Sequence, residues 1–180
     1  MIEAQKIANP ELRKIKNEPG YYKWWAKEGD LKKLLSKFTP KITFNEIKKY
    51  LESENDYYCI YVGISKSSIR KRLNTHINGV ILDSTLRKTI ASILAYYNDE
   101  NPEEKTNEFI DKLKLTYDYK DRNEVEEKET DLIKAKFHIL NNSKNNTELA
   151  KKYKIKEQLT EFRKKAEEAK PLIFKKETKK

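Results

Sequence analysis

An arginine and a histidine, Arg72 and His76, stand four residues apart in a basic stretch of this sequence. Residues at this spacing lie on one face of an α-helix, so the two side chains would stand side by side. Arginine presents a planar fork of donors that suits a phosphate oxygen, and it keeps its charge at neutral pH. Histidine can move a proton near neutral pH. The pair therefore predicts a site that handles phosphate groups.

A strand, a turn and a helix would position this pair. Residues 57–62 are aromatic, β-branched and apolar, which is typical of a buried strand. Gly63 interrupts this run, and a helix is predicted over residues 67–78. One side of that helix carries apolar residues at every fourth position: Ile69, Leu73 and Ile77. Arg72 and His76 would thus lie beside the core, next to a strand rich in tyrosine.

Two more strands are predicted, one over the aromatic residues 21–25 and one over the alternating residues 113–119. Two short helices are predicted between the strand at 21–25 and the strand at 57–64. We expect an α/β (α+β) fold, in which helices flank a small three-stranded, mainly antiparallel sheet. The domain organisation that we expect has four parts: an N-terminal helical segment at 1–18, a central domain at 19–142, a helical insertion within it at 26–56, and a basic C-terminal helix and tail at 143–180.

Composition narrows the class of protein. The 180 residues are 37% hydrophobic and can bury one good core, and 39 Lys and Arg against 29 Asp and Glu give a net charge of +10. A basic surface favours a polyanion such as nucleic acid as the partner.

The single cysteine, Cys59, excludes an internal disulfide and is expected to be a core residue. No apolar run approaches the roughly 20 residues that span a bilayer, so we expect a cytoplasmic protein.

A glutamate interrupts the apolar side of another predicted helix. Glu129 comes four residues after Val125 and four before Ile133, so all three would share one face. A carboxylate in such a row costs free energy unless it is paired or coordinates a metal ion. Glu129 is therefore a candidate for a role in binding or catalysis, against the alternative of an ordinary surface glutamate.

Taken in order, these residues resemble the GIY-YIG nuclease superfamily. The two signature tripeptides match Gly20-Tyr21-Tyr22 and Tyr61-Val62-Gly63, each at a predicted strand. Four single positions of the family's motif also match in order: Arg72, His76, Glu129 and Asn141. The resemblance covers about residues 19–142. The sequence departs from the family in the long connection between the two strands and in one extra residue before Arg72, which leaves Arg70 as a rival.

The resemblance implies a metal-dependent endonuclease that hydrolyses phosphodiester bonds in nucleic acid, which we expect to be DNA. Tyr22 and Tyr61 would point into the site, and one of them, with Tyr22 preferred, would accept a proton from the attacking water. Because tyrosine has an ordinary pKa near 10, a neighbouring cation such as Arg72 would have to favour its ionised form. Glu129 would hold one Mg²⁺ or Mn²⁺, with water completing the shell. Asn141 is the weakest of these candidate catalytic residues, because an asparagine in a loop usually forms a turn.

Basic residues outside this centre could follow the backbone of double-stranded DNA. They are Lys66, Arg70, Lys71, Arg87 and Lys88. With one site per chain, cutting both strands would need a homodimer or two sequential nicks. Two other interpretations stay open: a catalytically inactive module that binds nucleic acid on the same scaffold, and a helical interaction protein whose charge only keeps it in solution.

Overall fold

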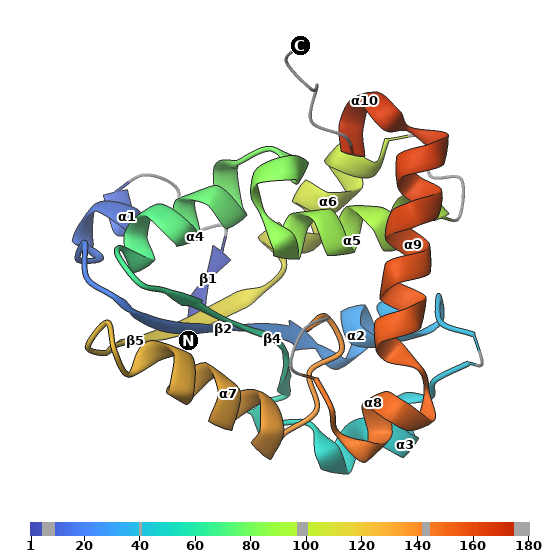
Figure 1. The fold of residues 1–180 in the computed structure, drawn as a ribbon, viewed down its shortest axis with the longest axis horizontal. Helices are drawn as coiled ribbons and strands as arrows, with labels where there is room; N and C mark the ends of the chain where they lie inside the picture. Colours follow the sequence, from blue (N-terminus) through green and yellow to red (C-terminus); the bar gives the residue numbers. More distant parts are fainter. Residues whose placement is uncertain (5–9, 40, 97–100, 142–144, 175–180) are drawn as a thin grey trace.

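A five-stranded antiparallel sheet forms the centre of the computed structural model, which describes residues 1–4, 10–39, 41–96, 101–141 and 145–174 (Figure 1). The strand order is β1-β5-β2-β4-β3. The strands are β1 (Ile2–Glu3), β2 (Gly20–Lys27), β3 (Ser53–Glu54), β4 (Tyr57–Ser65) and β5 (Lys114–Tyr119). The expected fold class and the antiparallel sheet flanked by helices are confirmed.

The expected number of strands is wrong, because the sheet has five strands and not three. The central β2, β4 and β5 correspond to the three predicted strands. The two additional strands, β1 and β3, contain two residues each and pair at the edges with β5 and β4. A pair of residues is too short to show the alternation from which strands are predicted, so β1 and β3 left no pattern in the sequence.

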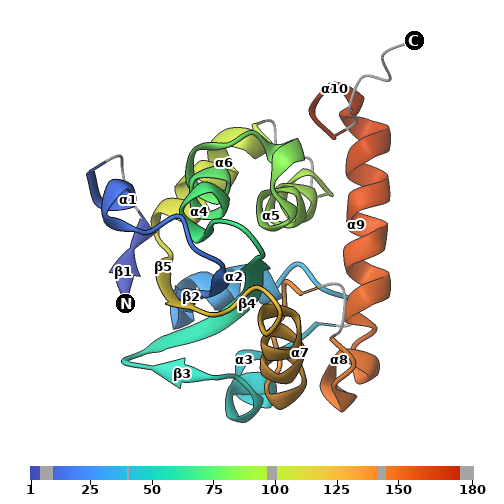
Figure 2. The ribbon, with the colours of Figure 1, turned by 60° about the vertical axis from the view of Figure 1, so that its left-hand side comes forward.

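Helices cover both faces of the sheet. In Figure 1, α4 (Ile69–Asn78), α5 (Thr85–Tyr96) and α6 (Pro102–Asp111) lie on one face, and α7 (Val125–Ala135) lies on the other. The long α9 (Ile155–Ala169) runs past the sheet and packs against α5 (Figure 2). The remaining helical elements are short: α1 (Pro10–Lys14), α2 (Glu28–Leu35), α3 (Phe44–Ile47), η2 (Lys48–Tyr50), η3 (Ile81–Asp83), α8 (Glu148–Lys152) and α10 (Pro171–Phe174). Among the described residues, no helix is both long and apolar enough to cross a membrane.

The chain between β2 and β4 carries the two predicted helices, α2 and α3. Thr43 and Glu46 form a capping box at the start of α3, as the sequence Thr-Phe-Asn-Glu favours. The N-terminal segment contains β1 as well as α1. The predicted boundary at Asn142 lies outside the described residues, as do residues 175–180 of the predicted tail.

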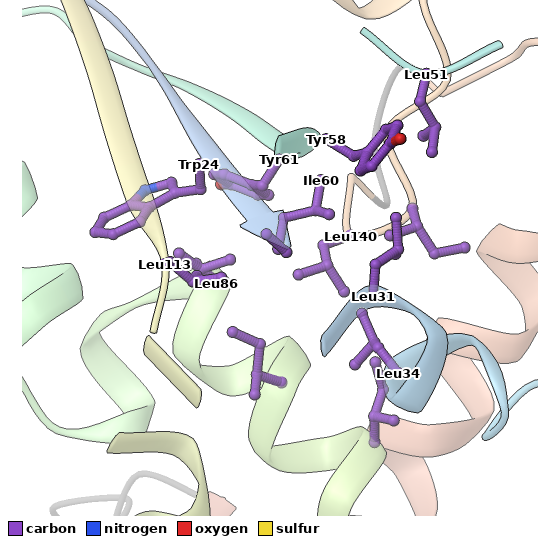
Figure 3. Close-up of a cluster of buried hydrophobic side chains, with 14 of the residues drawn as sticks. Trp24, Leu31, Leu34, Leu51, Tyr58, Ile60, Tyr61, Leu86, Leu113 and Leu140 are labelled. Carbon is purple, nitrogen blue, oxygen red and sulfur yellow. The ribbon is translucent and has the colours of Figure 1, made fainter. Parts of the chain in front are cut away.

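A β-bulge in β4 decides which side chains reach which face. Trp24 pairs with Tyr61 and Trp25 with Cys59, so Ile60 is the extra residue on β4. Trp24, Ile60 and Tyr61 therefore pack in one cluster with Leu86 of α5 (Figure 3). Cys59 joins Trp25 and Ile133 of α7 in a second cluster on the opposite face. Without the bulge, Cys59 and Tyr61 would share a face, because side chains in a strand alternate.

Candidate active site

A buried hydrogen-bonded row of three side chains lies between the sheet and the helices of the α4 face. The hydroxyl of Tyr22 lies 2.7 Å from Nε2 of His76, and Nδ1 of the same ring lies 2.6 Å from Oγ of Ser84. Tyr22 is 1% exposed, and His76 is fully buried. Both ring nitrogens of His76 therefore have a hydrogen-bond partner, and the ring cannot rotate without losing one of these hydrogen bonds.

The local fold explains how Tyr22 reaches His76 across 54 residues of sequence. Tyr22 of β2 pairs with Gly63 of β4, and a Cβ atom at Gly63 would collide with the Tyr22 hydroxyl and ring. The absence of a side chain at Gly63 thus lets the tyrosine lie across the neighbouring strand. On the helix, Ser68 caps α4 by accepting a hydrogen bond from the Lys71 backbone. The buried Leu73 holds the helix against the core and turns His76 toward the sheet.

Arg72 completes the cluster. Its Nε donates to the Tyr22 hydroxyl at 3.4 Å, and its guanidinium also interacts with the Tyr61 hydroxyl. Arg70 turns away instead, because its Nε donates to Oδ1 of Asn17 at 3.0 Å. Of the two arginines that the sequence left as rivals, Arg72 is the one that lies beside both tyrosines.

Burial and charge set the protonation of this cluster. Burial raises the pKa of both tyrosines, that of Tyr61 to about 12, while the charge of Arg72 lowers each of them. Burial, together with the charges of Arg72 and Arg87, holds the pKa of His76 well below its usual value. His76 is therefore neutral at pH 7, and one of its ring nitrogens is a proton acceptor.

Glu129 belongs to α7, which contacts both β4 and β2 from the other face of the sheet. Val125 and Ile133, four residues before and after it, are buried, whereas Glu129 itself is partly exposed. Its negative charge raises the pKa of both tyrosine hydroxyls, so its carboxylate lies within electrostatic reach of Tyr22 and Tyr61. A partly exposed carboxylate supplies the oxygen ligands that Mg²⁺ prefers.

The side chain of Asn141 contacts the backbone of β4 and not the tyrosine, histidine and arginine side chains of the cluster. Its Oδ1 accepts from the Val62 backbone N–H at 2.9 Å, and its Nδ2 donates to the Val62 carbonyl at 2.8 Å. Asn141 is 5% exposed, so both of its polar atoms are committed to Val62 inside the protein. It extends the edge of the sheet beside Tyr61 and fixes the strand that carries this tyrosine.

Two side chains at the site were not predicted as functional. Ser84 has a helix-cap signal in the sequence, and its Oγ does accept from the Arg87 backbone N–H at the start of α5, but the contact with His76 is tertiary. Arg163 of α9 lowers the pKa of Tyr61 through its positive charge. Its Nη2 donates to Oγ1 of Thr89 at 2.5 Å. Arg163 thus adds a second guanidinium near Tyr61 from a distant helix. No sequence pattern in α9 predicts this position.

The predicted nucleic-acid contacts fall into two groups. Lys71 is exposed, Arg70 is partly exposed, and Lys66 and Lys88 reach the surface while paired with Glu126 and Glu167, each at 2.7 Å. Arg87 departs from the expectation, because it is 2% exposed and cannot line a surface track. Its Nη1 donates to the carbonyls of His76 and Ile77 at 3.3 and 3.1 Å, and its Nη2 donates to Asn107. A cation at the C-terminal end of α4 complements the helix dipole, so Arg87 has a structural role.

One comparison with known proteins gives a match. A family model described as the GIY-YIG catalytic domain matches residues 20–165, from the first residue of β2 into α9. No curated protein and no solved structure matches the chain. The matched range contains both tyrosines, Arg72, His76 and Glu129, and it extends beyond Asn141 to include Arg163.

Proposed function

The chain belongs to the GIY-YIG catalytic domain family, and from this premise we propose that it is an endonuclease that hydrolyses phosphodiester bonds in DNA with the help of Mg²⁺ or Mn²⁺. The observation that carries the proposal is the hydrogen bond of 2.7 Å between the Tyr22 hydroxyl and Nε2 of His76, with Arg72 beside it. Nucleases of this kind need an activated water and a cation for the phosphate, and these three residues can supply both.

In the proposed reaction, Tyr22 is the general base. As the water attacks phosphorus, its proton moves to the Tyr22 oxygen and the proton of Tyr22 moves to Nε2 of His76. The negative charge of the bound phosphate would offset the charges of Arg72 and Arg87, which oppose protonation of the ring. Tyr22 then needs no ionisation beforehand, which its burial would oppose. The Nδ1–H of His76 donates to Ser84 in this tautomer, and that bond keeps Nε2 free to accept the proton.

The phosphate gains negative charge as the new bond forms and the bond to the leaving oxygen breaks on the opposite side. The leaving oxygen takes a proton from a solvent water, and His76 returns its proton to solvent after cleavage. Arg72 would hold a phosphate oxygen through this change, and its interaction with Tyr61 and the charge of Arg163 near Tyr61 support this role. A divalent ion held by Glu129, when bound, would supply further positive charge near the phosphate. Asn141 acts through Val62 as a positioning residue for Tyr61.

Basic residues around α4 support a nucleic acid as the substrate. Lys71 is exposed on the helix that carries Arg72, and Lys66 lies in the turn before that helix. We assign phosphate contacts to these two lysines and to Arg70, which would position the duplex without reading its sequence. One site per chain cleaves one strand, so cleavage of both strands would take two chains or two successive nicks.

The test is cleavage of supercoiled plasmid in Mg²⁺ or Mn²⁺ by the wild type and by Arg72→Ala, Glu129→Gln and Arg70→Ala. We expect Arg72→Ala and Glu129→Gln to lower the rate by about 100-fold or more. Arg70→Ala is the matched control for the chemical step, because it removes a guanidinium that turns away from the tyrosines. It should weaken plasmid binding but keep most of the cleavage rate at saturating enzyme.

Cleavage that survives both Arg72→Ala and Glu129→Gln would overturn this assignment of the site. Binding of the plasmid without cleavage in either metal would favour the alternative of an inactive nucleic-acid-binding module. The two outcomes are separated by gel-shift and nicking assays on the same preparations.

A further inference from the structure

Three potential metal ligands meet on the face of the sheet that α7 covers, away from the Tyr22–His76 cluster. Glu52 precedes β3, Cys59 lies in β4, and His138 follows α7. A carboxylate oxygen, the sulfur and a ring nitrogen from these residues all lie within 4.8 Å of one another. They come from three separate segments, and the bulge at Ile60 turns Cys59 to this face and Tyr61 to the other.

His138 is the member that most needs an explanation. It is fully buried, and neither of its ring nitrogens has a hydrogen-bond partner of normal geometry among the described residues. Leaving buried polar atoms without partners costs free energy, and such atoms are rare in folded proteins. The Lys136 carbonyl lies near the ring, as an outer partner commonly does for a histidine that binds a metal.

From these contacts we propose that Glu52, Cys59 and His138 bind one zinc ion. Thiolate sulfur, imidazole nitrogen and carboxylate oxygen are the three ligand types that Zn²⁺ takes in proteins, and a water can complete the tetrahedron. Mg²⁺ and Mn²⁺ prefer oxygen ligands, so the thiol distinguishes this site from the one at Glu129. On binding, the Cys59 thiol releases its proton to solvent and the sulfur bonds to the metal.

A neighbouring lysine orients the carboxylate. Nζ of Lys23 lies 2.6 Å from Oε1 of Glu52, and the lysine side chain is only 13% exposed. Carboxylates that bind metals are commonly held by such an outer partner. The pair leaves the second oxygen of Glu52 available for the ion.

The zinc ion would link three segments of the chain beside β4, the strand that carries Tyr61. Cys59 comes two residues before Tyr61, and His138 comes three residues before Asn141, whose amide holds Val62. A bound ion would therefore hold the segment 138–141 in place against β4. It would also stabilise the folded chain, because the three ligands are brought together only by folding.

The test is a titration of the metal-free, tag-free full chain with Co²⁺, which replaces Zn²⁺ and gives a thiolate-to-metal absorption band. Since the chain has a single cysteine, any such band reports Cys59. We expect the band to saturate at one Co²⁺ per chain, to disappear when Zn²⁺ is added, and to be absent in Cys59→Ser. Zn²⁺ should also raise the midpoint of thermal unfolding of the wild type.

Matched glutamate variants separate the two metal sites. Glu52→Gln and His138→Gln should each weaken Co²⁺ binding by more than about tenfold. Glu129→Gln should leave the titration unchanged. Absence of the band in the folded wild type would overturn the proposal, and so would a band that Glu52→Gln and His138→Gln both leave unchanged. Neither result depends on nuclease activity.

Discussion

Ser84 Oγ lies 2.6 Å from Nδ1 of His76, on the opposite side of the imidazole from Tyr22. The same oxygen accepts from the Arg87 backbone N–H and so begins α5. One serine thus starts a helix and fixes the orientation of a histidine at the candidate active site.

Ser84→Ala should therefore have two separable effects. Loss of the helix cap should lower the free energy of unfolding by about 1 kcal/mol, and loss of the partner of Nδ1 should lower kcat. Thr147→Ala is the matched control, because Thr147 caps α8 by accepting from the Ala150 backbone. It should cost similar stability with kcat unchanged. Denaturant unfolding and nicking kinetics measure the two effects, and equal kcat in both variants would remove Ser84 from the mechanism.

The two tyrosines should differ in their effect on the chemical step. Tyr22→Phe removes the proposed base and the hydrogen bond to His76, so it should lower the single-turnover rate by about 100-fold or more. Tyr61→Phe should cost less, about tenfold, because Arg72 and Arg163 remain at the phosphate. A larger loss in Tyr61→Phe would assign the role of base to Tyr61.

Substitutions of Asn141 test its role as a positioning residue. Asn141→Ala leaves the buried N–H and carbonyl of Val62 without partners, which should cost about 2 kcal/mol of unfolding free energy. Asn141→Asp keeps the acceptor for the N–H but sets a carboxylate against the carbonyl, so it should destabilise the fold by a similar amount. A stable and fully active Asn141→Asp would instead show that the bond from Nδ2 to the Val62 carbonyl is dispensable. Chemical unfolding and plasmid nicking measure the two properties.

Arg163 should contribute to cleavage from outside the motif. Arg163→Ala removes a positive charge close to Tyr61 and should lower the cleavage rate by about tenfold. Arg163→Lys keeps the charge and should recover part of the loss. The neighbouring Lys164 is exposed, so Lys164→Ala serves as the control and should leave the rate nearly unchanged. Equal rates in Arg163→Ala and Lys164→Ala would show that the second guanidinium is dispensable.

Acid should destabilise the metal-free protein partly through His138. Burial, together with the charge of Lys23, lowers its pKa from 6.5 to about 4, so the folded state resists protonation while the unfolded chain accepts the proton below pH 6.5. The contribution to stability is present above pH 6.5 and is lost as the pH falls toward 4, to a total of about 3 kcal/mol.

The measurement is the free energy of unfolding of chelator-treated wild type and His138→Gln between pH 7 and pH 4. The stability of the variant should fall less steeply than that of the wild type over this range, because glutamine takes up no proton. Parallel pH profiles would contradict the low pKa of His138.

Much of the fold and several residues of the candidate site could be predicted because they depend on local periodicity. The central strands and the helix over Arg72 and His76 follow from apolar residues that repeat at strand and helix spacing. Glu129 stood out because a carboxylate interrupted an apolar row. The strands of two residues each carried no such pattern, and the bulge at Ile60 arises only from the pairing of β2 with β4.

Local sequence patterns were enough to predict which residues share a face of one helix or strand. Which faces meet depends on the packing of the whole chain. That packing brings Tyr22 to His76, sets Arg72 and not Arg70 beside the tyrosines, buries Arg87 at the end of α4, and adds Ser84 and Arg163 to the candidate site. It also gathered Glu52, Cys59 and His138 from three segments. The physical reason is that periodicity fixes the direction of a side chain relative to its own element, whereas contacts between distant elements depend on how the whole core packs.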